Sequence, residues 1–435
     1  MFSKILIANR GEIAVRIIRA CREMGISTVA VYSSVDARSL HVALADEAYC
    51  IGESEAASSY LNAEAILSAA LVSGAQAIHP GYGFLSENPK FAQLCRKNGI
   101  MFIGPDSKFM ELFGDKAQAK QLFASAGLDV IPGAREVGDD ARALKLAEQL
   151  GYPVMLKAKL GGGGRGIRLV QAPQEMASAF AAARSEASSA FGNGALYIEK
   201  YIHPARHIEI QVLADEAGHV VCLGERDCSV QRKNQKLIEE SPSPALDDMR
   251  RDTIYDKVCS AVRAIGYTGA GTLEFLFDGE HFYFMEMNVR LQVEHSVTEI
   301  LTRVDIVKWQ IRIAAGLSLG FSQSDIPIKG SAIECRINAC APGKVEYMHL
   351  PGGPCVRFDT YLDAGSVISA YYDALLGKLV VYDIRREEAI RKMKSALCEL
   401  VIRGVPNNIS EQIKLIDSAE FMNGTYDLDF VAKTR

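Results

Sequence analysis

Strand-forming and helix-forming stretches alternate through the first hundred residues of the chain. Lys4–Asn9 is a short apolar strand, and Gly11–Gly25 places apolar residues at helical spacing and closes on a glycine. Ser27–Ser33 follows as a second strand-like segment, and the pattern recurs toward residue 105. Repeated strand–helix–strand units predict a parallel sheet with helices on its faces.

A dinucleotide-binding redox fold is the first alternative for such a beginning. Its fingerprint is G-x-G-x-x-G directly after the first strand. Here Asn9 is followed by Arg10, Gly11 and Glu12, without that glycine spacing. The sequence therefore favours an α/β unit that does not bind a redox dinucleotide.

The composition is that of a globular enzyme. Hydrophobic residues make up 49% and charged residues 23% of the 435 residues, so we expect two or three domains with their own cores. The net charge of −5 argues against a nucleic-acid partner, because phosphate neutralisation needs clustered excess Lys and Arg. No apolar run approaches the roughly 20 residues that a membrane span needs. We expect neither nucleic acid nor a membrane as a partner.

The ten cysteines do not follow a disulfide pattern. No C-x-x-C occurs, and Cys21, Cys95, Cys259 and Cys398 fall in helical stretches where we expect small buried hydrophobes. The chain runs from Met1 directly into a strand-like segment, with no secretory signal. A reduced, cytoplasmic location is the expectation.

A glycine-rich loop follows a strand that ends near Lys157. Glycines stand at positions 161 to 164 and at 166. They let the backbone approach a ligand and expose N–H groups suited to a triphosphate, and Lys157 adds a positive charge. The loop lacks the G-K-[ST] ending of a P-loop, and a flexible hairpin tip is the alternative interpretation.

Three later strand-like segments carry polar side chains at period two, which places them on one face. His207, Glu209 and Gln211 share such a face, and Glu274 lies within an apolar strand. The third segment, 284–295, alternates apolar residues with Glu286, Asn288, Arg290, Gln292 and Glu294. A solvated edge strand is the alternative, but five different functional groups in succession favour a site. Glu274, Glu286 and Asn288 offer hard oxygen ligands without His or Cys, which favours Mg²⁺ or Mn²⁺ over zinc.

Toward the C-terminus, Ala332–Ala339 alternates so that Glu334, Arg336 and Asn338 lie opposite Ile333, Cys335 and Ile337. Further strands are predicted at Ser366–Asp373 and Lys378–Asp383, and helices at Phe113–Gly127, Arg386–Leu400 and Asn408–Ala419.

The chain resembles biotin carboxylases over nearly its whole length, with the family's motifs in order and at the family's spacing. These motifs are ANRGEIA, HPGYGFLSEN, GGGGRG, RHIEIQVL, ERDCSVQRKNQK, GAGTLEFLF, MEMNVRLQVEH, ECRINA and YYDALLGK. The resemblance is to the biotin carboxylase subunit of a biotin-dependent acyl-CoA carboxylase, such as acetyl-CoA carboxylase. It implies an ATP-grasp fold with α/β and α+β parts. The implied domains are an N-terminal α/β (pre-ATP-grasp) domain at 1–112, an ATP-grasp domain at 113–328 with a mobile lid at about 131–203, and a C-terminal biotin carboxylase domain at 329–435.

The resemblance also implies a role for each matching position. The positions that match ATP contacts are Lys116, Lys157, Gly163, Gly164, Glu199, Lys200, His207 and Asn234, the last standing where the family usually has His. The metal ligands would be Glu274, Glu286 and Asn288. The bicarbonate site would be Lys236, Arg290, Gln292 and Val293, with Glu294 as general base and Arg336 stabilising the biotin enolate.

The implied reaction is the ATP- and Mg²⁺- (or Mn²⁺-) dependent carboxylation of biotin by bicarbonate, through carboxyphosphate, as the first half-reaction of a carboxylase of fatty acid biosynthesis. Met393–Lys394 lies in a predicted helix and not in a hairpin turn, so biotin is expected on a separate chain. The implied partners are a biotin carboxyl carrier protein, carboxyltransferase subunits and a second copy of the chain, with Arg16, Arg19 and Glu23 as candidate dimer contacts.

The sequence departs from the family at several places. Lys159 and Leu160 replace a Ser-Gly pair, Ser296 replaces a proline, and the segment after Asn338 is several residues shorter. Two alternatives stay open: an ATP-grasp ligase that joins a carboxylate to an amine, and a nucleotide-binding paralogue with weakened catalysis. The final carboxyl acceptor is not encoded in this chain, because the carboxyltransferase selects it.

Overall fold

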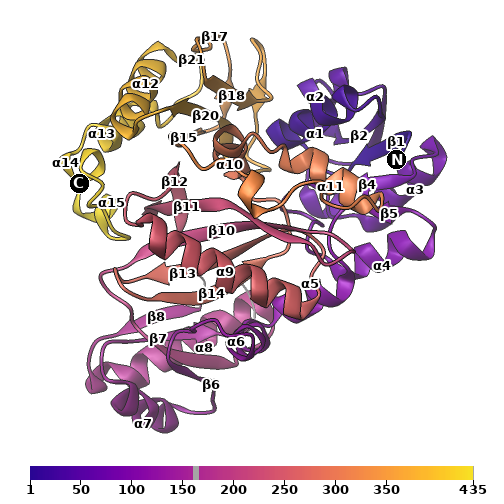
Figure 1. Cartoon of the computed structure of the whole chain (residues 1–435). Coiled ribbons are helices and arrows are strands. Elements are labelled where there is room, and N and C mark those ends of the chain that lie inside the picture. Colours follow the sequence, from indigo (N-terminus) through magenta and orange to yellow (C-terminus); the bar gives the residue numbers. More distant parts are fainter. Residues whose placement is uncertain (160–165, 435) are drawn as a thin grey trace.

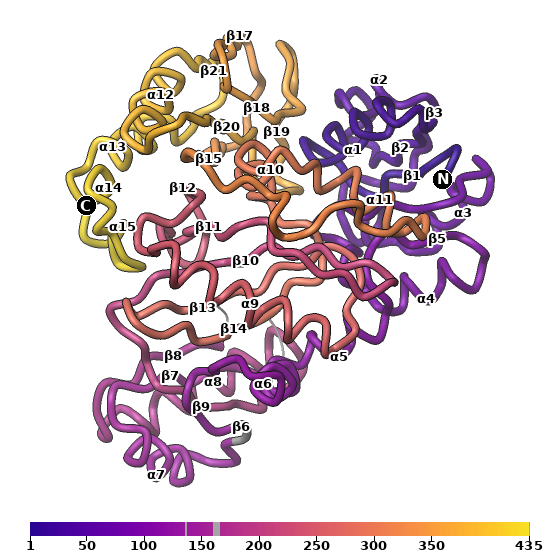
Figure 2. The backbone as a smooth tube through the Cα atoms, in the orientation of Figure 1, coloured from indigo at the N-terminus to yellow at the C-terminus, as the bar shows by residue number. Residues whose placement is uncertain are grey.

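The computed structural model describes residues 1–159 and 166–434, and omits the side chains of 135 and 136 (Figure 1). The N-terminal sheet, a small separate sheet and the C-terminal helices lie around one large central sheet (Figures 1 and 2). Within the described residues, no helix has the length and apolar character needed to cross a membrane.

The N-terminal part contains the predicted parallel sheet. Its five strands run in the order β3–β2–β1–β4–β5, and every pair is parallel. The strands are β1 (Lys4–Ile7), β2 (Ser27–Ser33), β3 (Glu47–Gly52), β4 (Ala77–His79) and β5 (Met101–Phe102), and the helices are α1 (Gly11–Glu23), α2 (Leu40–Leu44), α3 (Ala63–Ser73) and α4 (Pro89–Lys97). The strand predicted at Lys4–Asn9 is two residues shorter, because Asn9 turns its side-chain amide to the carbonyls of Pro80 and Tyr82.

The central sheet is antiparallel and has eight strands in the order β14–β13–β10–β11–β12–β15–β20–β18. Its strands are β10 (Arg206–Ala214), β11 (Val220–Arg232), β12 (Gln235–Ser241), β13 (Gly269–Phe277), β14 (Phe282–Asn288), β15 (Ser331–Asn338), β18 (Val356–Thr360) and β20 (Leu375–Asp383). β12 pairs with β15, so the sheet continues across the boundary that the sequence predicts near residue 328.

A separate four-stranded antiparallel sheet has its own hydrophobic core. It contains β6 (Gly133–Val137), β7 (Val154–Ala158), β8 (Ile167–Val170) and β9 (Leu196–Lys200), with α7 (Asp140–Leu150) and α8 (Met176–Phe191). Val154, Leu156, Phe180 and Ile198 are buried in this core, which shares no residue with the cluster beneath the central sheet.

The remaining elements connect these layers. They are α5 (Ser107–Gly114), α6 (Lys116–Ser125), α9 (Asp248–Ile265), α10 (His295–Thr302), α11 (Ile306–Ala314), α12 (Arg386–Glu399), α13 (Ile409–Ile416), α14 (Ala419–Met422), α15 (Phe430–Lys433), and the short pairs β16 (Gly343–Lys344) with β19 (Val367–Ile368) and β17 (Tyr347–His349) with β21 (Val401–Arg403). Asp115 caps α6 by accepting the backbone N–H groups of Ala117 and Gln118, so this helix begins at Lys116 and not at Phe113 as predicted.

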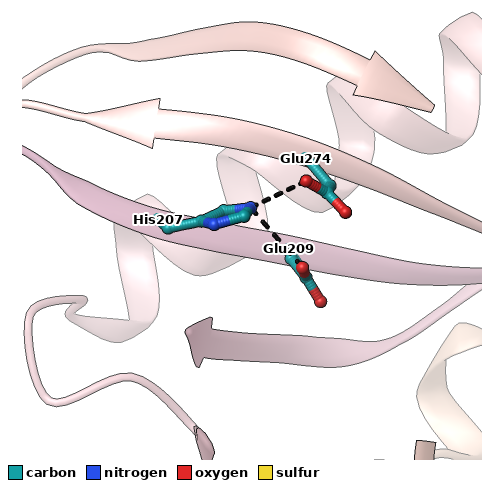
Figure 3. A group of neighbouring side chains, drawn as sticks. All are labelled: His207, Glu209 and Glu274. Atoms are coloured by element: carbon teal, nitrogen blue, oxygen red, sulfur yellow. Dashed lines mark hydrogen bonds and ion pairs between the residues drawn. The ribbon is translucent and has the colours of Figure 1, made fainter. Parts of the chain in front are cut away.

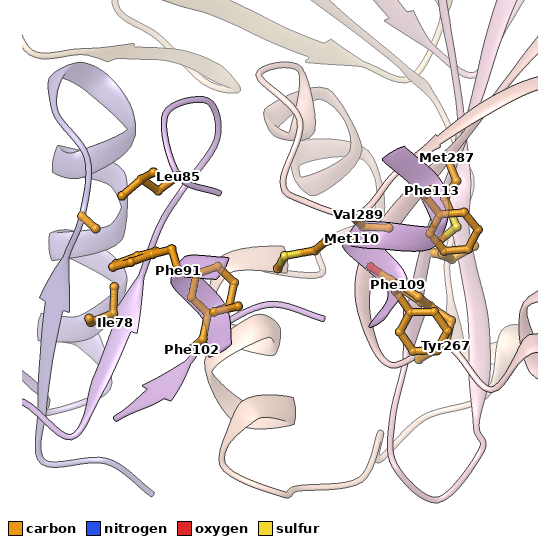
Figure 4. Close-up of a cluster of buried hydrophobic side chains, with 14 of the residues drawn as sticks. Ile78, Leu85, Phe91, Phe102, Phe109, Met110, Phe113, Tyr267, Met287 and Val289 are labelled. Carbon is orange, nitrogen blue, oxygen red and sulfur yellow. The ribbon is translucent and has the colours of Figure 1, made fainter. Parts of the chain in front are cut away.

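One hydrophobic cluster joins the N-terminal sheet to the central sheet. Figure 4 shows Phe91 and Phe102 under the first sheet, and Phe109, Phe113 and Tyr267 against the second. Helix α5 carries apolar side chains of this cluster between the two sheets. Because this core is continuous, the N-terminal loops are held rigidly against the strands that carry the polar face.

Some predictions of the sequence are wrong in detail. The strand expected over Ser366–Asp373 is limited to Val367–Ile368, and the last predicted helix is split by a break after Ile416. Cys398 is exposed, whereas Cys21 and Cys95 are buried as expected. All ten cysteines are free.

Candidate active site

A polar face crosses four strands of the central sheet. Arg226 on β11, Glu209 on β10, Glu274 on β13 and Glu286 on β14 are successive cross-strand neighbours. Paired residues in antiparallel strands point to the same side, so these charges gather on one face. The predicted face of His207, Glu209 and Gln211 is confirmed, since the alternating Ile210 and Val212 lie in the hydrophobic core opposite.

His207, Glu209 and Glu274 form a compact buried group on this face (Figure 3). His207 Nε2 lies 2.9 Å from Glu274 Oε2 and 3.5 Å from Glu209 Oε1. Burial would lower the pKa of His207, but the Glu274 carboxylate outweighs it and raises the pKa above its ordinary value. For Glu209, burial is the larger effect and raises its pKa to about 7.

The segment 289–294 corrects one prediction. The strand expected over 284–295 ends at Asn288, and Arg290, Gln292 and Glu294 lie in the loop between β14 and α10. Alternation on a strand therefore does not place them. Instead they are placed by side-chain bonds: Arg290 donates to the side-chain oxygens of Gln292 (2.8 Å) and Asn288 (3.0 Å), and Gln292 donates to Glu274 (3.0 Å).

Glu294 lies between two cations. Lys236 Nζ is 2.7 Å from its Oε1, and Arg336 Nη2 is 2.8 Å from its Oε2. Burial alone would raise the pKa of Glu294, but Lys236 and Arg336 hold it well below its usual range. Arg336 also bonds Glu239 at 2.6 Å, and Lys236 bonds Glu209. Arg336 faces the site as the alternation of β15 predicts.

The predicted nucleotide-binding lysines gather around a second set of carboxylates. Lys116 Nζ lies 2.5 Å from Glu286 Oε2, and Lys157 Nζ lies 2.9 Å from Glu199 Oε2. Lys200 instead donates to the backbone carbonyls of residues 151 and 152, at 2.7 and 3.3 Å. Gly163 and Gly164 lie outside the described residues.

Two cavities meet at this face. One of about 380 Å³ is lined by Lys116, Lys157 and His207, and another of about 750 Å³ by Tyr82, Glu294 and Arg336. Four residues line both cavities: Asn234, Lys236, Arg290 and Gln292. Asn234 occupies the tight turn between β11 and β12 with a φ of 64°, a conformation that Asn tolerates better than most residues. This arrangement gives two neighbouring compartments that share a charged wall.

The donor set of the predicted metal ligands fits a hard cation. Glu274 and Glu286 are cross-strand partners, and Asn288 follows on the same face of β14. Carboxylate and amide oxygens suit Mg²⁺ or Mn²⁺. In the structure Glu274 accepts a bond from Asn288 Nδ2 (2.6 Å), and the Asn288 oxygen accepts one from Arg290. Glu274 contacts His207 and Glu286 pairs with Lys116, and a bound metal would take the place of these contacts.

Sequence reasoning missed several residues that build the site. Glu87 accepts bonds from Arg290 Nε (2.9 Å) and from the N–H of Val289, so an N-terminal loop holds the segment 289–294. Arg226 is fully buried and contacts Glu209, Gln211 and Thr298. Lys378 donates to the carbonyl of Val293 at 2.7 Å. Glu87 and Lys378 do lie in quoted motifs, but only long-range contacts show their roles.

Models of three protein families match successive parts of the chain. The N-terminal domain of biotin carboxylase matches residues 1–110, the ATP-binding domain of the carbamoyl-phosphate synthase L chain matches 115–321, and the C-terminal domain of biotin carboxylase matches 334–433. The chain belongs to the biotin carboxylase family. The predicted family, the mixed α/β ATP-grasp fold and the class of ATP-dependent ligase are thereby confirmed.

Curated biotin carboxylases are similar over 99% or more of this chain. The enzyme of Nostoc sp. is 52% identical over 440 residues, covering 99% of this chain and 98% of the relative. Biotin carboxylase 1 of Bacillus subtilis is 48% identical over 442 residues, covering 99% and 98%. Relatives from chloroplasts of Populus trichocarpa and Arabidopsis thaliana are 49% identical over 440 residues.

Solved structures of biotin carboxylases agree with the fold. The biotin carboxylase domain dimer of Hydrogenobacter thermophilus 2-oxoglutarate carboxylase, in complex with MgADP, ADP and bicarbonate, has a TM-score of 0.96 at 48% identity, covering 100% of this chain and 98% of that one. The complex of biotin carboxylase with β,γ-ATP from Campylobacter jejuni has a TM-score of 0.97 at 46% identity, covering 100% and 99%.

Proposed function

We propose that this chain carboxylates biotin on a separate carrier protein, using bicarbonate and the energy of ATP. The observation that carries the proposal is the position of Glu294. It lies between Lys236 and Arg336, beside the wall that the two cavities share. The two cations suit a base that activates an anion. The two neighbouring cavities suit a reaction in which the product formed from that anion passes to a second substrate.

ATP would occupy the smaller cavity. Its phosphates would meet Lys116 and Lys157, and its reactive end would point toward Arg290 and the shared wall. Glu274, Glu286 and Asn288 would hold Mg²⁺ or Mn²⁺. When bound, the metal supplies positive charge that neutralises the transferred phosphoryl group. The same cavity is lined by three other matching positions, Lys200, His207 and Asn234. Glu199 adjoins it through its ion pair with Lys157.

Bicarbonate would bind against Lys236, Arg290, Gln292 and the backbone of Val293. As the anion attracts Lys236, Glu294 loses part of the positive charge beside it, and its pKa rises toward the range of a useful base. Glu294 then takes the bicarbonate proton while the oxygen attacks the γ-phosphorus of ATP, with ADP as the leaving group. The product, carboxyphosphate, breaks down to CO₂ and phosphate.

Biotin would enter the larger cavity. The released phosphate takes the N1 proton of biotin, and the nitrogen attacks CO₂. Arg336 faces this cavity and would stabilise the oxyanion that develops on the biotin ring. A closed site matters here, because carboxyphosphate is lost to water when the site is open.

Residues about 131–203 would act as the lid within the proposed ATP-grasp domain, 113–328, between domains at 1–112 and 329–435. Support comes from the separate core of β6–β9, α7 and α8, since a unit with its own core can rotate without exposing apolar surface. Lys157 and Glu199 belong to this unit, so its closure would bring them onto the nucleotide.

A biotin carboxyl carrier protein and carboxyltransferase subunits would complete the enzyme, which we place in the cytoplasm and in fatty acid biosynthesis. A homodimer is also proposed. Arg16 is a poor candidate for its contacts, because it bonds Glu299 (2.8 Å) and Asp305 (2.7 Å) within the chain. Arg19 is exposed, and Glu23 keeps 63% of its side chain exposed although it pairs with Lys308, so both remain candidates. Sedimentation at several concentrations tests the dimer.

ATP cleavage with and without bicarbonate tests the reaction. We expect turnover that requires bicarbonate and rises when biotin is added. Cleavage that ignores bicarbonate, but responds to another carboxylate together with an amine, would assign the chain to the ATP-grasp ligases instead.

A further inference from the structure

A fully buried lysine links three separate parts of the fold. Lys378 lies on β20 and has 0% of its side chain exposed. Its Nζ donates to the carbonyl of Val293 at 2.7 Å and lies 3.2 Å from Oε1 of Glu12. Glu12 begins α1, and Val293 precedes Glu294 in the loop after β14. One ammonium group therefore joins the N-terminal helix, the C-terminal strand and the loop of the base.

The ammonium is charged where it lies. Burial would lower the pKa of Lys378, but Glu12, Glu334 and Asp359 raise it above its ordinary value. Glu12 is also buried, at 3% exposure. Buried ion pairs are weak evidence for stability, so this one needs another explanation.

The bond to Val293 determines the direction of a peptide group. A trans peptide is planar, so holding its carbonyl also orients the N–H on the opposite side. Lys378 holds the carbonyl of Val293 and thereby orients the N–H of Glu294. The preceding carbonyl, that of Gln292, lies 2.8 Å from Nδ1 of His295, which orients the N–H of Val293. Two successive peptides beside the base are thus fixed by buried side chains.

The other end of the pair reaches a second residue in the lining of the larger cavity. The hydroxyl of Tyr82 donates to the same Glu12 oxygen that pairs with Lys378. Tyr82, Val293 and Glu294 all line this cavity. Through Glu12, the position of Tyr82 is therefore tied to the position of the Val293 carbonyl.

We propose that Lys378 is a positioning residue, which with Glu12 holds the Val293–Glu294 peptide in the geometry that bicarbonate requires and ties it to Tyr82 in the lining of the larger cavity. The inference rests on the proposed carboxylation of biotin. Lys378 does not touch a substrate in this account; it acts through the backbone of the loop.

The test is a double variant, Lys378→Met with Glu12→Gln. Lys378→Met alone would leave the Glu12 charge buried without its cation, and that variant is at risk of not folding. The double variant removes both charges and retains similar volumes. Lys392→Met is the matched control, because Lys392 also donates to a backbone carbonyl (Tyr382, 2.8 Å) and pairs with a carboxylate (Asp383, 2.8 Å), away from both cavities.

Folding is checked by circular dichroism and thermal unfolding, and bicarbonate-dependent ATP cleavage is then measured. We expect the double variant to raise the KM for bicarbonate about 10-fold or more, while the KM for ATP stays within about twofold, since misplacing a contact group lowers catalysis without altering a distant site. Lys392→Met should leave both values unchanged. A folded double variant with an unchanged KM for bicarbonate overturns the inference.

Glu12→Gln alone provides an independent test, because it keeps Lys378 on the Val293 carbonyl. Its effect on the KM for bicarbonate should be smaller than that of the double variant. An equal effect would mean that the charge pair matters and the carbonyl bond does not, which contradicts the inference. Absence of bicarbonate dependence in the unaltered protein would instead overturn the proposed function, and this inference with it.

Discussion

Arg336 Nη2 lies 2.8 Å from Oε2 of Glu294, so the proposed oxyanion stabiliser and the proposed base are paired with each other. Glu294 is thereby kept ionised, and its proton affinity is low. Substrate binding must loosen this pair before Glu294 can take a proton and Arg336 can reach biotin. The two groups are consequently expected to act in sequence: the base when bicarbonate arrives, and the guanidinium when biotin does.

Glu294→Gln should leave ATP binding nearly intact and lower bicarbonate-dependent turnover by on the order of 10²-fold or more, as expected for loss of a general base. Glutamine keeps the size, but its single carbonyl oxygen can accept a bond from only one of Lys236 and Arg336. Arg290→Ala should lower bicarbonate-dependent turnover by a similar factor, because it removes preorganised positive charge. Steady-state kinetics with a separate nucleotide-binding titration measures both.

Glu286→Gln should behave differently. Its carboxylate pairs with Lys116 and belongs to the proposed metal ligands, so its loss should weaken binding of Mg²⁺–ATP itself. Titration of nucleotide with and without Mg²⁺ separates the two effects. If Glu294→Gln, Arg290→Ala and Glu286→Gln all fail equally at nucleotide binding, the proposed division of roles is wrong.

Local sequence patterns predicted the scaffold of this site better than its catalytic segment. Period two along β10 and β13 correctly placed Glu209 and Glu274, because a strand must alternate between core and solvent faces. The same rule failed after Asn288. There the chain leaves the sheet, and Arg290 is oriented by Glu87, a residue about two hundred positions earlier, which no local period encodes.

Buried histidines should make the protein less stable as the pH falls. Burial lowers the pKa of His41 to about 4 in the folded chain, against an ordinary value near 6.5. Between these two pH values the histidine is protonated in the unfolded chain and neutral in the folded chain. The free energy of unfolding therefore decreases as the pH is lowered, by at most about 1.4 kcal/mol per pH unit for this group.

The matched variant is His41→Gln, which stays neutral at every pH and can still donate to the carbonyl of Val31, the partner of His41 Nε2 at 3.3 Å. Between about pH 7.5 and about pH 5, its free energy of unfolding should fall by roughly 2 kcal/mol less than that of the unaltered chain. Urea unfolding at both pH values measures this. Equal losses would show that His41 does not contribute to the pH dependence.

The short segment after Asn338 should limit the use of free biotin. In the structure this segment is tied back to the C-terminal part by the bond from Cys340 N to the Pro406 carbonyl (2.7 Å), and Asn338 and Ala339 line the larger cavity. A cavity with fewer covering residues fixes biotin less well and excludes less water. Bicarbonate-dependent ATP cleavage should persist, with free biotin a poor substrate compared with the biotinylated carrier, which supplies effective concentration.

Grafting a family-length loop between Asn338 and Gly343 tests this directly. The graft should improve carboxylation of free biotin more than that of the carrier. If free biotin already saturates tightly, or the graft changes neither substrate, the segment does not control access.

Long-range pairing also explains why the residues around Lys378 were not predicted. Sequence patterns marked β20 as a strand, but they do not reveal which carbonyl a buried lysine will reach. Lys378 lies opposite Arg336 in the β15–β20 pair and opposite Asp359 in the β18–β20 pair, and only this register brings it to Val293.

Transfer of radiolabelled bicarbonate carbon to biotin tests the central claim most directly. The protein is incubated with labelled bicarbonate, Mg²⁺, ATP and the biotinylated carrier, and the label on the carrier is counted before and after acid treatment. The account predicts acid-labile label that requires ATP and is lost in Glu294→Gln. ATP cleavage without any label on the carrier, or label that appears without ATP, would contradict it.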